Sequence, residues 1–175
     1  MKKKTFLSLV LAIMSIAILP SCDNGEYSPI KASTDSCQIV VSCVDGKGQD
    51  LLLDKEFLDA IKIEGDGSHS RIRYDVINQG EKKAILFEAE LPDQSDMKWT
   101  NDHKEASGIS KMTIKFKKDK LQLKCHIKYI ANRPPAASGG KATIEEVQCN
   151  NKSYNRSGNA VYITLNMDKN GKLLK

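Results

Sequence analysis

The sequence predicts an all-β protein, which we expect to be an antiparallel β-sandwich of the immunoglobulin-like (Ig-like) type with about eight strands and one short helix. Two observations support this class. After residue 36, apolar and polar residues alternate with period two, and each alternating run keeps one polar face, as antiparallel sheets do and βαβ folds do not. A small β-barrel is the alternative, because closure of the sheet also removes free strand edges.

Each element is predicted from its own residue pattern. Cys37, Ile39, Val41 and Cys43 share one face of the first strand. A short helix is expected over residues 54–60, because Asp54 can cap its first turn. The remaining strands are expected around residues 61–63, 72–76, 85–91, 111–117, 120–129, 142–149 and 160–167.

The first 21 residues have the organisation of a signal peptide. Three lysines, residues 2–4, precede an uncharged apolar segment over residues 6–19, and small residues follow it. As a helix this segment would span about 21 Å, which is less than the roughly 30 Å hydrocarbon core of a bilayer. We therefore expect a cleaved leader rather than a transmembrane helix.

The end of this leader resembles a bacterial lipobox through Leu19, Ser21 and Cys22, although Pro20 departs from the usual Ala or Ser. The resemblance implies cleavage before Cys22 and attachment of acyl chains such as palmitate to it. Two or three acyl chains give stable membrane anchoring. Acidic residues after the cysteine, Asp23 to Glu26, resemble the surface-export signal of Bacteroidota lipoproteins, so we expect an outer-membrane, surface-exposed protein. A periplasm-facing location is the alternative, because an Asp at this position resembles a retention signal in enterobacteria.

The mature chain is expected to form one domain. Residues 22–36 are small or polar and predict a flexible tether, residues 37–168 the β-sandwich, and residues 169–175 a C-terminal tail. Removal of the leader leaves 24 of the 27 basic residues against 22 acidic ones, so the formal charge falls from +5 to +2. Without a basic excess, we expect no nucleic-acid partner.

Four cysteines remain after Cys22. Cys37 and Cys43 are six residues apart on one predicted strand, so their Cα atoms would lie about 20 Å from each other, whereas a disulfide requires less than about 7 Å. This leaves two pairings open: 37–125 with 43–149, or 37–149 with 43–125. We expect at least one inter-strand disulfide in an exported protein, and free buried thiols are the alternative.

No residue pattern indicates a catalytic site, a metal site or a cofactor. Cys125 and His126 are adjacent on a predicted strand, so they project to opposite faces and cannot act as nucleophile and base for each other. His103 lies in a polar loop, where solvated side chains are far commoner than acid–base catalysts. The cysteines and histidines lack zinc-ligand spacing. We therefore expect a protein that is not an enzyme.

The most specific surface feature is a row of basic residues. A hairpin over residues 111–129 would carry them on its outer face, where they would either be solvated and discourage edge pairing or bind acidic polysaccharide, lipopolysaccharide phosphate or an acidic partner. Because like charges repel across strands, we expect compensation from Glu88, Glu90, Glu145 or Glu146. The basic residues are Lys111, Lys115, Lys117, Lys120, Lys124, His126 and Lys128.

Asp45, Gly48, Asp50, Leu51 and Leu52, together with the leader and the all-β pattern, resemble small lipoproteins of gut Bacteroidota. That group has no agreed activity, so the resemblance implies location more than chemistry. We expect a lipid-anchored, non-enzymatic binding protein whose partner is a glycan or a protein. Two alternatives are an inhibitor of a hydrolase and an accessory of glycan-processing enzymes whose acids come from separate strands.

Overall fold

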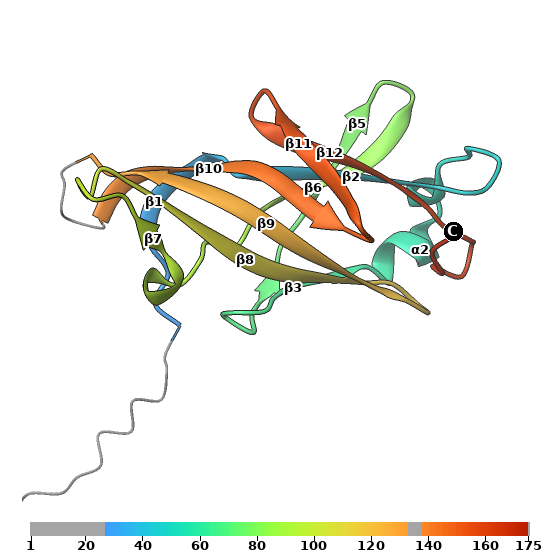
Figure 1. Cartoon of the computed structure of the whole chain (residues 1–175). Coiled ribbons are helices and arrows are strands. Elements are labelled where there is room, and N and C mark those ends of the chain that lie inside the picture. Colours follow the sequence, from blue (N-terminus) through green and yellow to red (C-terminus); the bar gives the residue numbers. More distant parts are fainter. Residues whose placement is uncertain (1–26, 133–137, 175) are drawn as a thin grey trace, which may run out of the picture.

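The computed structural model describes residues 27–132 and 138–174 (Figure 1). The predicted signal peptide and Cys22 lie outside these ranges. Strands make up 59% of the structure and helices 8%, so the all-β class is confirmed.

Along the chain, three short helical segments lie between strands. The helical segments are η1 (Leu51–Leu53), α2 (Lys55–Asp59) and η2 (Gln94–Asp96). The strands are β1 (Lys31–Ser36), β2 (Gln38–Val44), β3 (Lys62–Gly65), β4 (Arg71–Ile72), β5 (Asp75–Gln79), β6 (Lys82–Glu88), β7 (Lys98–Trp99), β8 (Glu105–Lys115), β9 (Lys120–Ile130), β10 (Ser138–Cys149), β11 (Lys152–Ser157) and β12 (Ala160–Asn166).

These strands form one continuous sheet in the order β4-β3-β8-β9-β10-β11-β12-β2-β6-β5, with β1 beside β10 and β7 beside β8. The sheet curls into a half-barrel (Figure 1), so the Ig-like sandwich is not confirmed. Only Arg73 and Tyr74 separate the two outermost strands, β4 and β5, so the chain crosses directly from one end of the sheet to the other. The pairs β1–β10 and β2–β12 are parallel, which corrects the purely antiparallel prediction.

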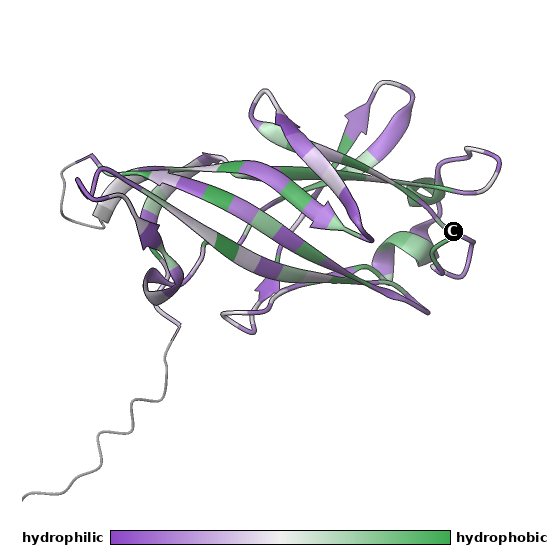
Figure 2. Ribbon diagram, in the orientation of Figure 1, coloured by the Kyte–Doolittle hydropathy of each residue, from purple (hydrophilic) through white to green (hydrophobic). Residues whose placement is uncertain are grey.

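The core lies inside the curl. Figure 2 shows hydrophobic and hydrophilic residues alternating along β8, β9 and β10, because successive side chains of a strand point to opposite faces. The inward set includes Met112, Ile114, Leu121, Leu123 and Ile127, all at most 1% exposed. Full burial of each such side chain stabilises the fold by about 1.5–3 kcal/mol.

The predicted helix forms, and it begins directly after its predicted capping residue, Asp54. The side chain of Asp54 accepts hydrogen bonds from the N–H groups of Glu56 (2.9 Å) and Phe57 (3.4 Å) at the start of α2. Phe57 is buried, and its ring lies 6.2 Å from that of Phe116. The helix therefore closes one part of the core beside the β8–β9 turn.

Both predicted terminal segments are partly folded. The predicted tether, residues 22–36, contains β1, and Ile30 is buried with Met97 and Tyr129 in a second hydrophobic cluster. The predicted tail contains Leu173, which forms a β-bridge with Met167 and packs against the main core. β1 pairs with the distant strand β10, whereas the C-terminal residues fold back on the end of β12. Backbone pairing of this kind orders mainly polar segments that local hydrophobicity does not mark.

The predicted disulfides are not formed in the structure. Cys37, Cys43, Cys125 and Cys149 are buried free thiols. Desolvation raises the pKa of Cys37, Cys43 and Cys125 to about 12, and it raises the pKa of Cys149 as well. Alternation correctly placed the first three on the inner face, which accommodates a free thiol as a small hydrophobic group.

Candidate binding surface

Strands β8 and β9 form a long antiparallel hairpin whose outer face carries most of the predicted basic residues. The register places Lys111 opposite Lys124, Lys115 opposite Lys120, and Lys128 opposite Ser107. His126 also lies on this face, opposite Ile109, while Cys125 points into the core. Five of the six predicted lysines are thus brought together, and Lys117 instead lies in the turn between the strands.

Acidic residues of β3, α2 and β8 itself neutralise part of this basic surface. The ion pairs are Lys115–Glu64, Lys117–Glu56 and Lys128–Glu105. Glu105, followed more weakly by Glu145, raises the pKa of Lys128. Of the four acids expected to compensate, Glu145 thus acts on Lys128, whereas Glu88 and Glu90 form no ion pair with a lysine of the described residues and accept hydrogen bonds from Thr34 and from Gly67 and Ser68.

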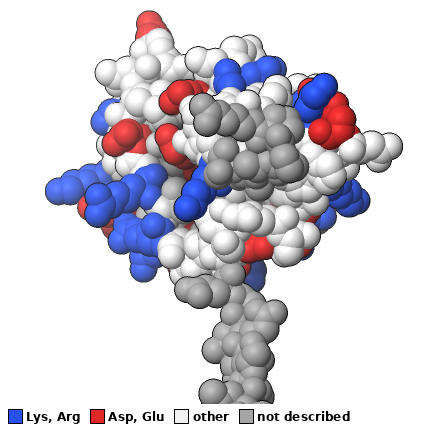
Figure 3. Space-filling model, turned by 90° about the vertical axis from the view of Figure 1, so that its left-hand side faces the viewer, with Lys and Arg blue, Asp and Glu red and all other residues white. Residues whose placement is uncertain are grey.

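Three lysines of the face have no such acidic partner in the described structure. Lys111, Lys120 and Lys124 form no ion pair with any residue in the described ranges. Two of them, Lys111 and Lys124, face each other across the hairpin. Figure 3 views the end of the molecule where β1 and β7 lie and shows basic side chains on both flanks of this end, with acidic side chains among them.

A groove of about 510 Å³ crosses this part of the outer face. Ile109 stands in it with 46% of its surface exposed. The Nε2 atom of His126 is buried and has no hydrogen-bond partner among the described residues. The polar and charged lining residues are Asp96, Lys98, Ser107, Lys111, Lys124, His126 and Glu145.

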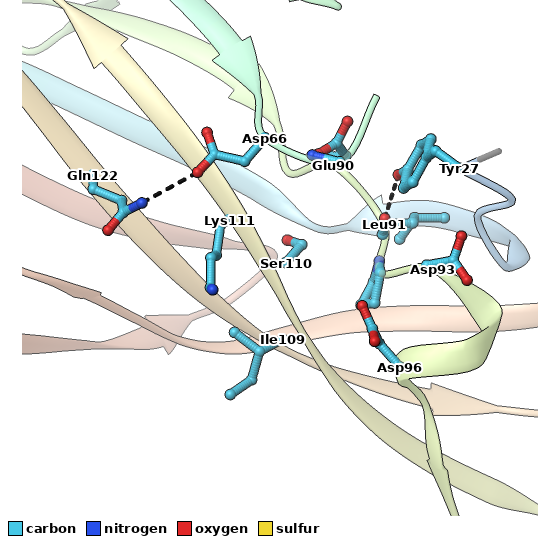
Figure 4. Close-up of a pocket in the computed structure, with 12 residues that line it drawn as sticks. Tyr27, Asp66, Glu90, Leu91, Asp93, Asp96, Ile109, Ser110, Lys111 and Gln122 are labelled. Atoms are coloured by element: carbon cyan, nitrogen blue, oxygen red, sulfur yellow. Dashed lines mark hydrogen bonds between the residues drawn. The ribbon is translucent and has the colours of Figure 1, made fainter. Parts of the chain in front are cut away.

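A second cleft, of about 370 Å³, adjoins the groove and shares Asp96, Ile109 and Lys111 with it (Figure 4). It lies beside β8, between the end of β3 and the start of β7. Its other polar lining residues come from segments far apart in sequence, so no local pattern marked them. They are Tyr27, Asp66, Glu90, Asp93, Ser110 and Gln122.

Three of the four carboxylates in this cleft have structural partners on both oxygens. Asp66 accepts hydrogen bonds from Thr113 (3.0 Å) and Gln122 (3.2 Å). Glu90 accepts from the N–H groups of Gly67 (3.0 Å) and Ser68 (2.9 Å), which fixes the turn after β3.

Asp93 accepts from Ser28 and Ser95, and these hydrogen bonds hold its pKa below the usual range. A general acid would need the opposite shift. The carboxylate of Asp96, by contrast, accepts no hydrogen bond from the described part of the chain. None of these four acids lies within a named strand, and three of them hold turns and the ends of segments in place.

The residues of the lipoprotein-like motif have structural roles. Asp45 accepts from the N–H groups of Lys47 and Gln49 within its turn, and Gly48 adopts a positive φ of 79°. Asp50 caps η1 through the N–H of Leu52 and also accepts from Lys83. The motif thus connects β2 to α2, and the buried Leu51 and Leu52 enter the core.

Other candidate residues are not assembled into a chemical site. His103 lies in the turn before β8 with a positive φ of 51°, and its ring stands 6.2 Å from Trp99. Within residues 27–132 and 138–174, no group of three His, Cys, Asp or Glu side chains is arranged to hold a metal ion. In the same ranges, no helix is both long and apolar enough to cross a bilayer.

No protein-family model, no curated protein and no solved structure matches this chain.

Proposed function

We propose that the protein is a lipid-anchored, non-enzymatic binding protein of the bacterial outer membrane, and that the outer face of β8 and β9 binds an acidic glycan. Acylation of Cys22, implied by the lipobox-like residues, would supply the anchor. The hydrogen bonds that engage Asp66, Glu90 and Asp93 support a non-enzymatic role, because these carboxylates already serve the fold.

One observation carries the binding proposal: Lys111 and Lys124 lie opposite each other without an acidic partner in the described structure. Two ammonium groups on neighbouring strands repel each other, and an anion placed between them removes that cost. The exposed Ile109 beside them adds apolar contact area within the same groove. A groove that combines these two lysines with an exposed apolar side chain fits a chain of sugars that carry carboxylate or phosphate groups.

The test is titration of the purified protein with polygalacturonate at low ionic strength, with neutral dextran as the control polymer. The double variant Lys111→Gln/Lys124→Gln should bind about tenfold more weakly, a loss of about 1.4 kcal/mol. Binding to wild type should weaken as salt is added, because exposed charges are screened.

The matched control is Lys47→Gln/Lys82→Gln, which removes the same charge at exposed positions outside the face. An equal loss of affinity in this control would show that binding depends only on the net charge of the protein, which would contradict the proposal. Failure of the wild-type protein to bind polygalacturonate would contradict it as well.

A further inference from the structure

The edge of β8 that faces away from β9 is covered by two strands with a gap between them. β3 pairs with residues 112–115 and β7 with residues 106–107 of β8. The N–H of Thr100 donates to the C=O of Glu105 (2.9 Å) at the end of the β7 pairing that is remote from the gap. The gap itself is bordered on one side by the pair of Lys98 with Ser107 and on the other by the N–H of Asp66, which donates to the C=O of Lys111 (2.9 Å). Between these borders, no described strand pairs with this edge.

The gap leaves backbone groups open at the floor of the acidic cleft. In an antiparallel strand, the N–H and C=O of alternate residues point to the same side. Since the C=O groups of Glu105 and Lys111 face this edge, the N–H and C=O of Ile109 face it too. Neither group of Ile109, nor the N–H of Lys111, hydrogen-bonds to any residue in the described ranges.

From this geometry we infer that the cleft is a docking site for a short extended peptide with basic side chains, which pairs with the open edge of β8. A peptide residue presents its own N–H and C=O on one side and so satisfies both groups of Ile109. A single trans amide, such as the acetamido group of a sugar, points its N–H and C=O in opposite directions and satisfies only one.

The charge of the cleft selects a basic peptide. Among the described residues, four carboxylates and a single basic side chain, Lys111, line it. The carboxylates are those of Asp66, Glu90, Asp93 and Asp96. Asp96 is the carboxylate without an acceptor role in the described structure, so it is available to a bound ammonium or guanidinium group. The protein's own segment after Cys22 carries Asp23 and Glu26, whose charge is wrong for this cleft.

The size of the gap limits the length of the docked segment. From Ser107 to Lys111 the strand advances four residues, about 14 Å at 3.4 Å per residue. The turn at Asp66 closes one end and η2 with Asp96 closes the other (Figure 4). About three peptide residues fit between them, and the rest of the partner must leave toward solvent.

The probe is a pool of acetylated and amidated pentapeptides with lysine at positions 2 and 4 and Val, Thr or Tyr at positions 1, 3 and 5. Fluorescence anisotropy should show saturable binding to the purified protein. N-methylation of the central residue removes its N–H donor and should weaken binding about tenfold. A pool with glutamate in place of lysine should not bind.

Two variants of the protein locate the contact. Ile109→Pro removes an N–H that faces the gap rather than the β9 ladder, so the sheet can tolerate it, and it should abolish peptide binding. Ile109→Val keeps the N–H and should bind as wild type does. Asp96→Asn should weaken binding several-fold without a change in melting temperature.

Three results would overturn the inference. The first is no binding of the lysine pool at about 1 mM, a concentration that detects binding free energies as small as about 4 kcal/mol. The others are binding of the N-methylated peptide, or of the glutamate pool, with the same affinity as the lysine pool. The peptide comparison uses the wild-type protein, so it decides the question even if Ile109→Pro fails to fold. A Lys124→Gln variant that loses affinity for polygalacturonate but binds the lysine pool as wild type does would separate this site from the glycan-binding face, because Lys124 lines the groove but not the cleft.

Discussion

At the scale of single residues, the four buried thiols make the sharpest prediction. Burial raises the pKa of Cys37, Cys43 and Cys125 to about 12, so almost no thiolate is present near neutral pH. The native protein should therefore react very slowly with 5,5′-dithiobis-(2-nitrobenzoic acid). Under denaturing, non-reducing conditions, all four thiols should react at once.

The count is cleanest in a Cys22→Ser variant, because this removes the only other cysteine in the chain. Two reactive thiols instead of four in denaturant would show an inter-strand disulfide and contradict the free thiols of the structure. The spacing of the cysteines excluded a 37–43 bond, yet it could not decide between a disulfide and free thiols. Whether two of these cysteines can form a disulfide depends on the relative positions of strands that are far apart in the sequence.

At the scale of elements, local patterns predicted the segments that bury apolar side chains. β9 and α2 were predicted because alternating leucines and a capping Asp54 mark them in the sequence itself. β1, β7 and β11 were missed, because β1 and β11 are mainly polar and β7 has only two residues. The same limit explains why the sequence indicated the basic face, which lies on one hairpin, but not the cleft beside it.

The cap of α2 provides a test of the locally predicted part of the fold. Asp54→Ala removes the acceptor for the N–H groups of Glu56 and Phe57, so the free energy of unfolding should fall by about 1 kcal/mol. Urea unfolding measures this change, and Lys55→Ala at the next, exposed position is the control. An equal effect of the two substitutions would show that the cap does not stabilise the helix.

At the scale of the whole molecule, the N-terminal segment fixes which end of the domain lies nearest the proposed lipid anchor. Ser28 donates to Asp93 (2.6 Å), Gln94 donates to the C=O of Ser28 (3.0 Å), and Ile30 donates to the C=O of Pro92 (3.3 Å). Four residues separate Cys22 from Tyr27, so their Cα atoms lie at most about 18 Å apart. If Cys22 is acylated, the end that carries Tyr27 and the cleft must stay close to the membrane surface.

Trp99, the single tryptophan of the chain, reports on this arrangement because it packs beside the cluster of Ile30 and Tyr129. Energy transfer from Trp99 to dansyl-labelled lipid headgroups should be strong for the acylated protein in vesicles. A 20-residue Gly-Ser insertion after Glu26 should reduce it, because such a linker has a mean end-to-end distance of about 25 Å. Cys22→Ala should lose both fatty-acid labelling and energy transfer. If the protein carries the fatty-acid label but its energy transfer does not change with the insertion, this end of the domain points away from the membrane. Wild-type protein without the fatty-acid label would contradict the anchor itself.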